Sequence, residues 1–490
     1  MGQKLKILLV SSEVAPFAKT GGLADVTGAL PKAIQKLGHD IRVLLPYYRM
    51  VKLGQFKTEE VVRELKVPIS NRIETSAVRQ THIATPAGKV PVYLLENDKY
   101  YDRKELYSTP KGDYEDNAER FIYFSRAALE MLKAIDFRPD VIHCNDWQAG
   151  LIPIYLKSIY LYDPFFKNTA SVFTIHNLAY QGKFWHFDMH LTGLGWEYFI
   201  PDWIEFYGKI NLLKAGILHT DLVSTVSKTY SQEIQTPEYG CGLEGVLRAR
   251  ASDLHGIVNG LDYEVTDPSI DKYLKDHYDA RNPEGKHKNK VELQKRFQLP
   301  QKDVPILGMI GRLDAQKGWD LISYIIEDLM KLDLQMVVLG SGAEEYEKIL
   351  REKAEKYPQK IGLRVAFDPA LAQLIYAGSD MFIMPSKFEP CGLGQLISLR
   401  YGTIPIVRAT GGLADTIKDY NPKTGAGNGF VFKEYSGKEL LATVKRALEV
   451  YKDQPTWREL IINGMQQDFS WTNSAKEYIK LYQKAIEKHG

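Results

Sequence analysis

The chain has 490 residues, of which 44% are hydrophobic and 25% are charged, as in an ordinary soluble globular protein. This length exceeds the size at which a single core stops growing, so we expect two domains. The 63 Lys and Arg against 61 Asp and Glu leave a net charge of +2, which excludes the basic footprint of a nucleic-acid-binding protein. No apolar run could cross a bilayer, and Cys144, Cys241 and Cys391 are too few for a disulfide framework. We therefore expect a cytoplasmic protein without a membrane partner.

Apolar runs alternate with helical patterns along the first half of the chain. Strands are predicted at 7–10, 41–45, 90–95, 141–143, 171–175 and 222–225. Helices are predicted at 118–135 and 149–161. Because the strands are apolar throughout, the pattern is typical of a parallel sheet with both faces covered.

The first strand leads into the hexapeptide Thr-Gly-Gly-Leu-Ala-Asp at 20–25, which recurs at 410–415 after another apolar run. A Gly-Gly pair between a buried strand and a helix leaves backbone N–H groups uncovered, and these favour a phosphate or a carboxylate. Lys19 stands directly before the first copy and adds a cation. Turn chemistry alone explains one copy, but two copies in matching contexts predict two α/β domains that face each other across a ligand.

A second series of strands is predicted at 306–310, 336–339, 363–367, 381–384, 404–407 and 430–432. Residues 262–304 between the two series are highly charged, contain one predicted helix at 290–297, and are interpreted as a linker. The predicted organisation is an N-terminal domain (1–261), this linker, a C-terminal domain (305–470) and a final segment (471–490). Both domains are expected to be doubly wound, with ligand sites at the carboxyl ends of their strands.

Polar side chains follow the predicted strands of the first half at the points where a site is expected. Asn145 and Asp146 follow one strand, and His176 and Asn177 follow the next. Core groups with satisfied hydrogen bonds are the plain alternative for Asp146 and His176. Their joint placement at the ends of two strands favours a site.

In the second half, Arg312 and Lys317 lie five residues apart on a turn that leads into a helix. A forked donor and a point cation at such a turn suit a diphosphate, whereas a lone Arg would be interpreted as a solvated salt bridge. Glu389 precedes Cys391 and Gly392 at the start of another helix, where a carboxylate either caps the helix or accepts hydrogen bonds from sugar hydroxyls. Cys391 is interpreted as a small packing residue, because no base accompanies it.

A dinucleotide oxidoreductase is the competing class at this point. The Gly-x-Gly-x-x-Gly at 240–245 follows a polar segment rather than a buried strand, and the Gly-Ser-Gly at 340–342 lacks the third glycine, so this hypothesis is weak. The sequence has neither Asp-x-Asp nor a His/Cys cluster with metal-ligand spacing. We therefore expect no metal or other cofactor, with charge neutralised by Lys, Arg and backbone dipoles.

Together these motifs resemble those of the bacterial glycogen synthase and plant starch synthase family, in the same order and over nearly the whole chain. The resemblance rests on segments 19–26, 114–121, 145–150, 173–182, 225–227, 238–243, 257–260, 311–313, 316–318, 385–393 and 410–416. It implies the GT-B architecture: an acceptor-side N-terminal Rossmann-like domain, a nucleotide-sugar-binding C-terminal one, and a last helix that crosses back to the first. It also implies transfer of glucose from ADP-glucose to the non-reducing 4-hydroxyl of an α-1,4-glucan such as glycogen, starch or a malto-oligosaccharide, with retention of configuration.

The resemblance also implies roles for individual residues. Cations would hold the diphosphate, Glu389 the glucose hydroxyls, and Phe367 would stack on adenine. The implied catalytic residues are Lys19, Asp146, His176, Arg312, Lys317 and Glu389. The implied donor-binding residues are Lys19, Gly21, Gly22, Asp25, Asn177, Asn259, Arg312, Lys317, Phe367, Glu389, Cys391, Gly392, Leu393 and Thr410. The implied acceptor-binding residues are Tyr114, Asn117, Tyr180 and Gln181.

The chain departs from the family pattern at three positions. Asn145 stands where many members have His, and Phe367 stands where many bacterial members have Tyr. Ile397 lies eight residues after Glu389, so the paired glutamates of other retaining GT-B enzymes are absent. This spacing favours the synthase family over the sucrose and sucrose-phosphate synthases.

Two alternatives to an ADP-glucose-dependent synthase stay open on the sequence. One is a GT-B transferase that uses UDP-glucose or another acceptor, because phosphate and glucose contacts are the same for both nucleotides. The other is a catalytically silent glucan-binding protein, which would be expected to have lost the charged site residues. If the chain comes from a plant or an alga, a plastid replaces the cytoplasm as the expected location.

Overall fold

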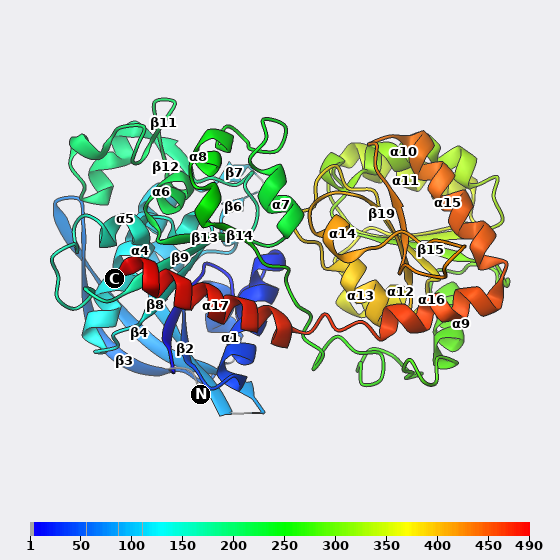
Figure 1. The fold of residues 1–490 in the computed structure, drawn as a ribbon, viewed down its shortest axis with the longest axis horizontal. Helices are drawn as coiled ribbons and strands as arrows, with labels where there is room; N and C mark the ends of the chain where they lie inside the picture. The colour runs from blue at the N-terminus through cyan, green and yellow to red at the C-terminus, as the bar shows by residue number, and fades with distance from the viewer. Residues whose placement is uncertain (1–3, 55, 87, 110) are drawn as a thin grey trace. The chain divides into compact units, whose positions relative to one another are not determined.

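The computed structural model describes residues 4–54, 56–86, 88–109 and 111–490, and it divides the chain into two compact units (Figure 1). The first unit comprises Met1–Val226, Ser231–Gly260 and Trp471–Gly490. The second unit comprises Ser227–Tyr230 and Leu261–Ser470. Each unit is built on its own β-sheet, as the strand–helix alternation of the sequence predicts.

The second unit is built on six parallel strands in the spatial order β17-β16-β15-β18-β19-β20. The strands are β15 (Ile306–Ile310), β16 (Gln335–Leu339), β17 (Ile361–Arg364), β18 (Met381–Met384), β19 (Ile404–Arg408) and β20 (Phe430–Phe432). Numbered within the unit, this order is 3-2-1-4-5-6, the doubly wound arrangement of Rossmann-like domains. The winding reverses between β15 and β18, so a ligand site is expected at the carboxyl ends of these two strands.

The main sheet of the first unit has nine strands in the order β14-β13-β9-β8-β1-β2-β5-β4-β3. They are β1 (Lys6–Val10), β2 (Asp40–Pro46), β3 (Glu59–Ile69), β4 (Arg72–Thr85), β5 (Gly88–Glu96), β8 (Val141–Asn145), β9 (Ala170–Ile175), β13 (Leu222–Thr225) and β14 (Leu254–Gly256). The parallel strands wind as in the second unit and reverse between β1 and β8. The antiparallel hairpin β3–β4 extends the sheet beyond β5 and was not predicted from the sequence.

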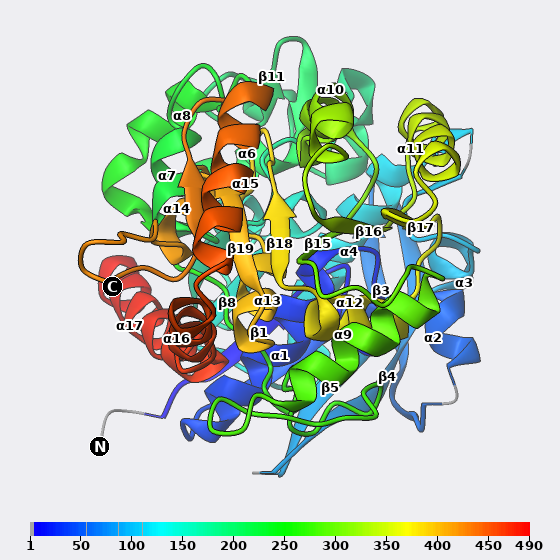
Figure 2. The ribbon, with the colours of Figure 1, turned by 90° about the vertical axis from the view of Figure 1, so that its right-hand side faces the viewer.

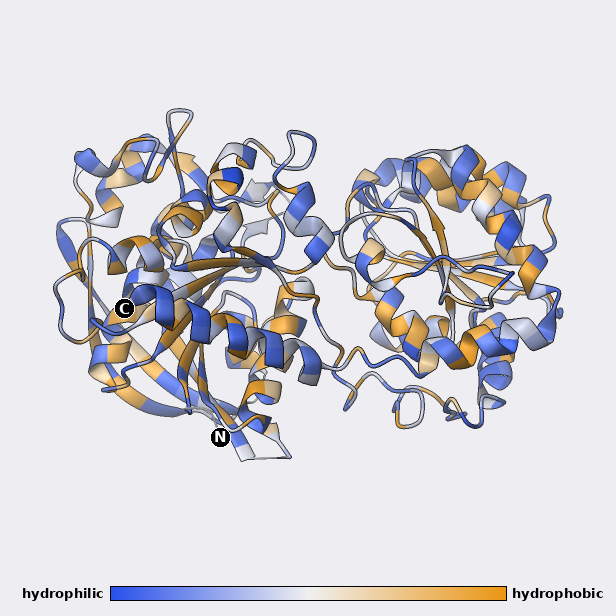
Figure 3. Cartoon of the chain, viewed as in Figure 1, coloured by the Kyte–Doolittle hydropathy of each residue, from blue (hydrophilic) through white to orange (hydrophobic). Residues whose placement is uncertain are grey.

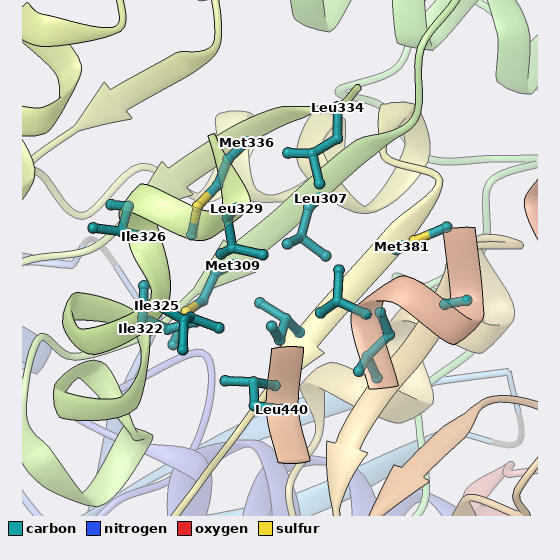
Figure 4. Packing of buried hydrophobic residues seen from close by; sticks show 14 of the residues in the cluster. Leu307, Met309, Ile322, Ile325, Ile326, Leu329, Leu334, Met336, Met381 and Leu440 are labelled. Atoms are coloured by element: carbon teal, nitrogen blue, oxygen red, sulfur yellow. The ribbon is translucent and has the colours of Figure 1, made fainter. Parts of the chain in front are cut away.

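Helices cover both faces of the second unit's sheet (Figure 2). On one face, α10 (Trp319–Leu329) and α15 (Gly437–Tyr451) enclose a core that includes Leu307 and Met309 of β15 (Figure 4). On the other face, α9 (Gly285–Arg296) and α12 (Pro369–Gly378) pack against a cluster that includes Ile306. Successive residues of a strand point to opposite faces, so a strand covered on both sides must be apolar throughout. Figure 3 shows this as apolar strands between helices that are apolar on one side.

Residues 262–304, interpreted above as a linker, belong to the second unit. They form α9, which starts before the predicted helix and packs along α12. The ammonium group of Lys286 is buried here and donates to the Ala377 and Tyr401 carbonyls (both 3.0 Å) and to Thr403 Oγ1 (2.6 Å). A charged segment therefore packs as part of a domain, because main-chain oxygens satisfy its buried cation.

Two other predicted elements differ from those observed. The helix predicted at 149–161 is limited to α5 (Leu151–Leu156) after a short 3₁₀ turn. The strand predicted at 363–367 is β17, which ends at Arg364, so Phe367 lies in the loop beyond it.

The final helix α17 (Trp471–His489) belongs to the first unit and packs against α1 (Gly22–Lys36) and β9. Its apolar side is buried through Ala475, Tyr478 and Tyr482. At its end, His489 Nδ1 lies 3.3 Å from Asp221 Oδ2. Among the described residues, no helix is both long and apolar enough to cross a membrane.

Candidate active site

In the second unit, the loops after β15 and β18 pack directly against each other at the reversal of the sheet. Gly318 adopts φ 79°, and a Cβ atom there would lie 2.2 Å from the Pro385 carbonyl oxygen. Only glycine permits this approach, which brings the basic turn after β15 against the loop that carries Glu389.

An ion pair joins these two loops. Lys317 Nζ lies 2.6 Å from Glu389 Oε2, and the Glu389 side chain is only 8% exposed. Ser386 Oγ donates to the same carboxylate oxygen at 3.0 Å. Asp314 fixes the turn below Lys317 by accepting its backbone N–H at 3.0 Å. The pair is therefore held rigidly at the carboxyl ends of β15 and β18, where a doubly wound sheet binds its ligand.

Arg312 lies beside this pair on an exposed surface. Its Nη1 lies 3.0 Å from Asp314 Oδ2, and its side chain is 56% exposed. The salt bridge that the sequence offered as the plain alternative therefore exists. Because the Arg312 side chain is exposed, its ion pair with the partly buried Asp314 is weak and leaves the guanidinium able to bind a diphosphate instead.

The loop after β18 continues through Cys391, Gly392 and Leu393 into α13 (Gly394–Arg400). Cys391 is buried, and Gly392 adopts φ 72°. Thr410 is buried at the start of α14 (Gly411–Thr416), the helix formed by the second hexapeptide. Phe367, in contrast, is 85% exposed, so a large flat ring is presented to solvent. Such a ring offers a surface for stacking.

In the first unit, Asp146 follows β8 with the unusual backbone angle φ 55°. One of its carboxylate oxygens accepts the His176 backbone N–H at 2.8 Å, and the Asn177 backbone N–H also bonds to this carboxylate. The Asp146 pKa is raised to about 7, mainly by burial; the two backbone amides lower it and the charge of Glu13 raises it. β8 and β9 thus hold Asp146 and His176 together, as the sequence predicts.

His176 is held as a neutral imidazole. Its Nε2 lies 2.9 Å from Asn145 Oδ1, and the amide nitrogen of Asn145 donates to the Val10 carbonyl. Asn145 Oδ1 is therefore the acceptor, so the proton lies on Nε2 and Nδ1 can accept a hydrogen bond. Burial lowers the His176 pKa to about 3. Asn145, which stands where many family members have His, thus sets the tautomer of His176.

The loop before α1 carries Lys19, Gly21 and Gly22. Lys19 Nζ lies 2.6 Å from Asp25 Oδ1, with both side chains partly exposed. A Cβ atom added at Gly21 or Gly22 would meet nothing within 4 Å, so the backbone here is open. The prediction that these amides await an anion needs a correction, because the carboxylate of Glu13 accepts the Thr20 and Gly21 N–H groups.

Of the remaining predicted residues of the first unit, some are hydrogen-bonded within the protein and others are exposed. Asn117 donates to the Tyr107 carbonyl and accepts from Arg120, while Gln181 donates to the Cys241 carbonyl and accepts from Asn211. Both amides are occupied within the protein. Tyr180 is 56% exposed, Tyr114 is half-buried, and the buried Asn259 side-chain oxygen has no partner among the described residues.

Sequence reasoning missed Glu13 and its partner Tyr107. Glu13 looked like one of the polar residues that end the first apolar run, and Tyr107 lies 94 residues away in no recognised motif. No local signal relates the two. The described residues also contain no group of three or more His, Cys, Asp or Glu side chains that could hold a metal ion.

The fold and these residues define a class of protein. Two doubly wound domains, one with a Lys–Glu pair at the reversal of its sheet and the other with Asp146 bonded to the His176 backbone at the carboxyl ends of β8 and β9, are those of a GT-B glycosyltransferase. The starch synthase catalytic domain model matches residues 6–249, and the model for glycosyl transferases group 1 matches residues 290–466. The chain therefore belongs to the family of glycogen and starch synthases, as the resemblance implied, and it is a glucosyltransferase.

Known proteins support this assignment over the whole length of the chain. A glycogen synthase from Desulforudis audaxviator (strain MP104C) is 52% identical over 495 residues, which cover 99% of this chain and 97% of that protein. A glycogen synthase from Moorella thermoacetica (strain ATCC 39073 / JCM 9320) is 51% identical over 489 residues, covering 100% of this chain and 98% of that protein.

Solved structures support the fold. The catalytic domain of starch synthase IV from Arabidopsis thaliana, bound to ADP and acarbose, matches with a TM-score of 0.91 and 33% identity, covering 99% of this chain and 100% of that one. A sucrose-phosphate synthase from Thermosynechococcus elongatus matches with a TM-score of 0.59 and 16% identity over 98% of each chain. The second match supports the fold alone.

Proposed function

We propose that this protein is a glycogen synthase that transfers glucose from ADP-glucose to the non-reducing 4-hydroxyl of an α-1,4-glucan, with retention of configuration. The observation that carries the proposal is the ion pair of the partly exposed Lys317 with the buried Glu389 at the sheet reversal of the second unit, in a chain about half identical to glycogen synthases. The ADP and acarbose bound to the Arabidopsis protein support a nucleoside diphosphate and a glucan-like molecule as ligands.

We assign donor binding in the second unit to groups at the carboxyl ends of its strands. Arg312 and Lys317 bind the diphosphate, and Glu389 accepts hydrogen bonds from the glucose hydroxyls while Lys317 holds it in place. The backbone of Gly392 and Leu393 lies in the same loop and is assigned to the phosphate. Phe367 stacks on the adenine through its exposed ring. Cys391 and Thr410 are buried and shape this loop.

We assign the reacting centre in the first unit to Asp146 and His176. As the diphosphate departs, positive charge grows on the sugar ring, and an ionised Asp146 stabilises it. The neutral His176 accepts a hydrogen bond from a sugar hydroxyl through Nδ1. Lys19 is assigned to the diphosphate, and Asn177 and Asn259 to the donor.

In this mechanism the departing phosphate takes the proton of the attacking 4-hydroxyl on the same face of the sugar. The C1–O bond to the diphosphate breaks, and the new C1–O bond forms on the face that the leaving group vacates, so configuration is retained. The route needs no enzymic nucleophile. Cations directed at the leaving oxygens supply the main stabilisation of the transition state.

We assign the acceptor to Tyr114 and Tyr180, because their rings are partly exposed. Asn117 and Gln181, whose amides are engaged within the protein, are assigned to shaping this surface. A cytoplasmic location is proposed because the three cysteines, Cys144, Cys241 and Cys391, form no disulfide bond.

A side-by-side assay with ADP-glucose and UDP-glucose, with glycogen as acceptor and EDTA present, tests the proposal. We expect preferential turnover of ADP-glucose, with glucose incorporation equal to nucleoside diphosphate release. Turnover of UDP-glucose alone would assign the protein to the UDP-dependent alternative. Turnover of neither would contradict the proposed function, and activity that disappears with EDTA would contradict metal independence.

A further inference from the structure

The carboxylate of Glu13 is nearly inaccessible to solvent, at 4% exposure of the residue, and accepts four hydrogen bonds. Oε2 accepts the backbone N–H groups of Thr20 at 2.5 Å and Gly21 at 3.1 Å. Oε1 accepts the hydroxyl of Thr20 at 2.6 Å and that of Tyr107 at 2.9 Å. No ion pair to Glu13 exists among the described residues, so these four donors compensate its charge.

Three of the four donors belong to the loop that carries Lys19. The loop is otherwise open, because a Cβ atom added at Gly21 or Gly22 would meet nothing within 4 Å. Lys19 itself pairs with the partly exposed Asp25. The Glu13 carboxylate is therefore the main buried contact that fixes the backbone between Lys19 and the start of α1.

The fourth donor comes from a distant part of the chain. Tyr107 OH donates to Glu13 and lies 2.7 Å from Ser12 Oγ, so its hydroxyl is fixed on both sides. The Tyr107 carbonyl accepts the Tyr114 backbone N–H at 3.0 Å and the Asn117 side-chain amide at 2.9 Å. Tyr107 thus connects Glu13 to the segment that carries the proposed acceptor residues.

We propose that Glu13 is a positioning residue that fixes the Lys19 loop, and that its bond to Tyr107 couples this donor loop to the segment of Tyr114 and Asn117. The expected effects on the KM values for donor and acceptor rest on the proposed function. A change at Tyr107 then alters the KM for the donor, although Tyr107 belongs to the acceptor segment. In equilibrium binding, the donor and the acceptor should change each other's affinity by the same factor, since coupling between two binding sites is reciprocal.

The chain offers a matched control. Tyr48 is also buried, and its hydroxyl has no hydrogen-bond partner among the described residues. Tyr48→Phe and Tyr107→Phe remove the same atom from the same unit, but only the second removes a bond to Glu13. Glu13→Gln keeps one oxygen for the two amides, whereas Glu13→Ala leaves all four donors unpaired.

Hydrogen exchange of the peptide covering residues 19–25 tests the fixing of the loop without any substrate. We expect protection in the wild type and in Tyr48→Phe, reduced protection in Tyr107→Phe, and loss of protection in Glu13→Ala. Wild-type protection in Tyr107→Phe would contradict the proposal. If Glu13→Ala does not fold, Glu13→Gln replaces it.

Steady-state kinetics test the coupling. We expect Tyr107→Phe to raise the donor KM about tenfold with kcat changed less, Glu13→Ala to lower kcat/KM about 100-fold, and Glu13→Gln to restore about tenfold of that loss. Adding Tyr107→Phe to Glu13→Ala is expected to cost nothing more, because the shared bond is already gone. Additive losses, or equal KM values for Tyr107→Phe and Tyr48→Phe, would overturn the coupling. A wild type inactive on ADP-glucose would refute the proposed function, while the exchange data would still decide the role of Glu13.

Discussion

The two copies of Thr-Gly-Gly-Leu-Ala-Asp have identical sequences and each follows a strand, β1 or β19, yet their surroundings differ. In the first copy, a Cβ atom at Gly21 or Gly22 would meet nothing within 4 Å. In the second, a Cβ atom at Gly411 would lie 2.0 Å from the Glu389 carbonyl oxygen, and one at Gly412 would lie 2.0 Å from that of Cys391. Glycine therefore leaves the backbone open in one unit and permits close packing in the other.

The aspartates that end the two copies differ in the same way. Asp25 pairs with the partly exposed Lys19. Asp415 accepts the Ser227 and Thr229 hydroxyls and the Lys228 and Thr229 backbone N–H groups, all within the second unit. The first copy thus presents groups to solvent, and the second supports the loop of Glu389. A sequence motif sets the local turn, but its environment decides whether space is left around its glycines or the turn packs closely.

The largest effect is expected from Glu389→Ala. The second copy packs against the backbone of Glu389, so this variant tests the side chain alone. Glu389→Ala removes the group assigned to the glucose hydroxyls but keeps the carbonyl oxygen that Gly412 N–H contacts at 3.2 Å. We expect turnover to fall by about 100-fold or more while the chain stays folded. Kinetics and thermal unfolding of the same preparation provide the measurement. Near-normal turnover would remove Glu389 from the site.

Gly412→Ala and Gly22→Ala test the comparison itself. Gly412→Ala forces a methyl group onto the Cys391 backbone and should lower the free energy of unfolding by about 3 kcal/mol. Gly22→Ala should leave stability unchanged, because the space is open, and should raise the donor KM instead. Urea unfolding and donor kinetics of both variants distinguish the two effects. Equal stability losses would mean that the two copies do not differ as described.

The second unit packs its glycine pair, so its contact with adenine is assigned to the side chain of Phe367. Phe367→Ala tests this contact. The ring is 85% exposed, so its loss should not affect folding. We expect the KM for ADP-glucose to rise about tenfold with little change in kcat, since stacking on a base is uniform binding. An effect on kcat alone would argue against an adenine contact.

Asp415→Ala and Asp25→Ala extend the comparison to the last residue of each copy. Asp415→Ala leaves the donors around Ser227–Thr229 unpaired and should cost about 1–2 kcal/mol of stability. Asp25→Ala removes only a partly exposed ion pair and should leave the unfolding curve unchanged. Identical unfolding curves for the two variants would contradict the structural role assigned to Asp415.

The smallest expected effect concerns the pH dependence of kcat/KM, through Asp146 and the neighbouring Glu13 that bonds to the first copy. Burial raises the Asp146 pKa to about 7, and the negative charge of Glu13 contributes to the rise. If the ionised carboxylate acts, kcat/KM should increase as the pH passes about 7. Glu13→Gln removes the neighbouring charge, so the acidic limb should shift to lower pH by less than about one unit. A shift to higher pH would contradict this assignment.

The same raised pKa of Asp146 also makes stability depend on pH, but stability should fall with rising pH whereas kcat/KM should increase. The folded protein holds the Asp146 proton more tightly than the unfolded chain does, so this residue makes stability fall as the pH rises from about 4 to about 7. Asp146→Asn should reduce that fall, measured by urea unfolding at several pH values. An unchanged pH dependence would show that Asp146 titrates normally.

Much of the fold could be predicted because its signals are local. The apolar strands of both sheets and the glycine-rich turns after β1 and β19 follow from residues close together in sequence. The hairpin β3–β4 was missed because its strands are largely exposed and lack apolar runs. The segment 262–304 was misread because its charge hid the buried contacts of Lys286.

By itself, the sequence determined the winding of strands and helices, the positions of Lys19, Asp146, His176, Arg312, Lys317 and Glu389 at strand ends, and the family. These follow from hydrophobic periodicity and from motifs of a few residues. Only the tertiary structure decided that Glu13 occupies the amides of one glycine pair and that the Glu389 loop closes over the other. The reason is physical: both depend on contacts between residues far apart in the chain, such as Glu13 with Tyr107 and Gly411 with Glu389, and no local pattern encodes such distances.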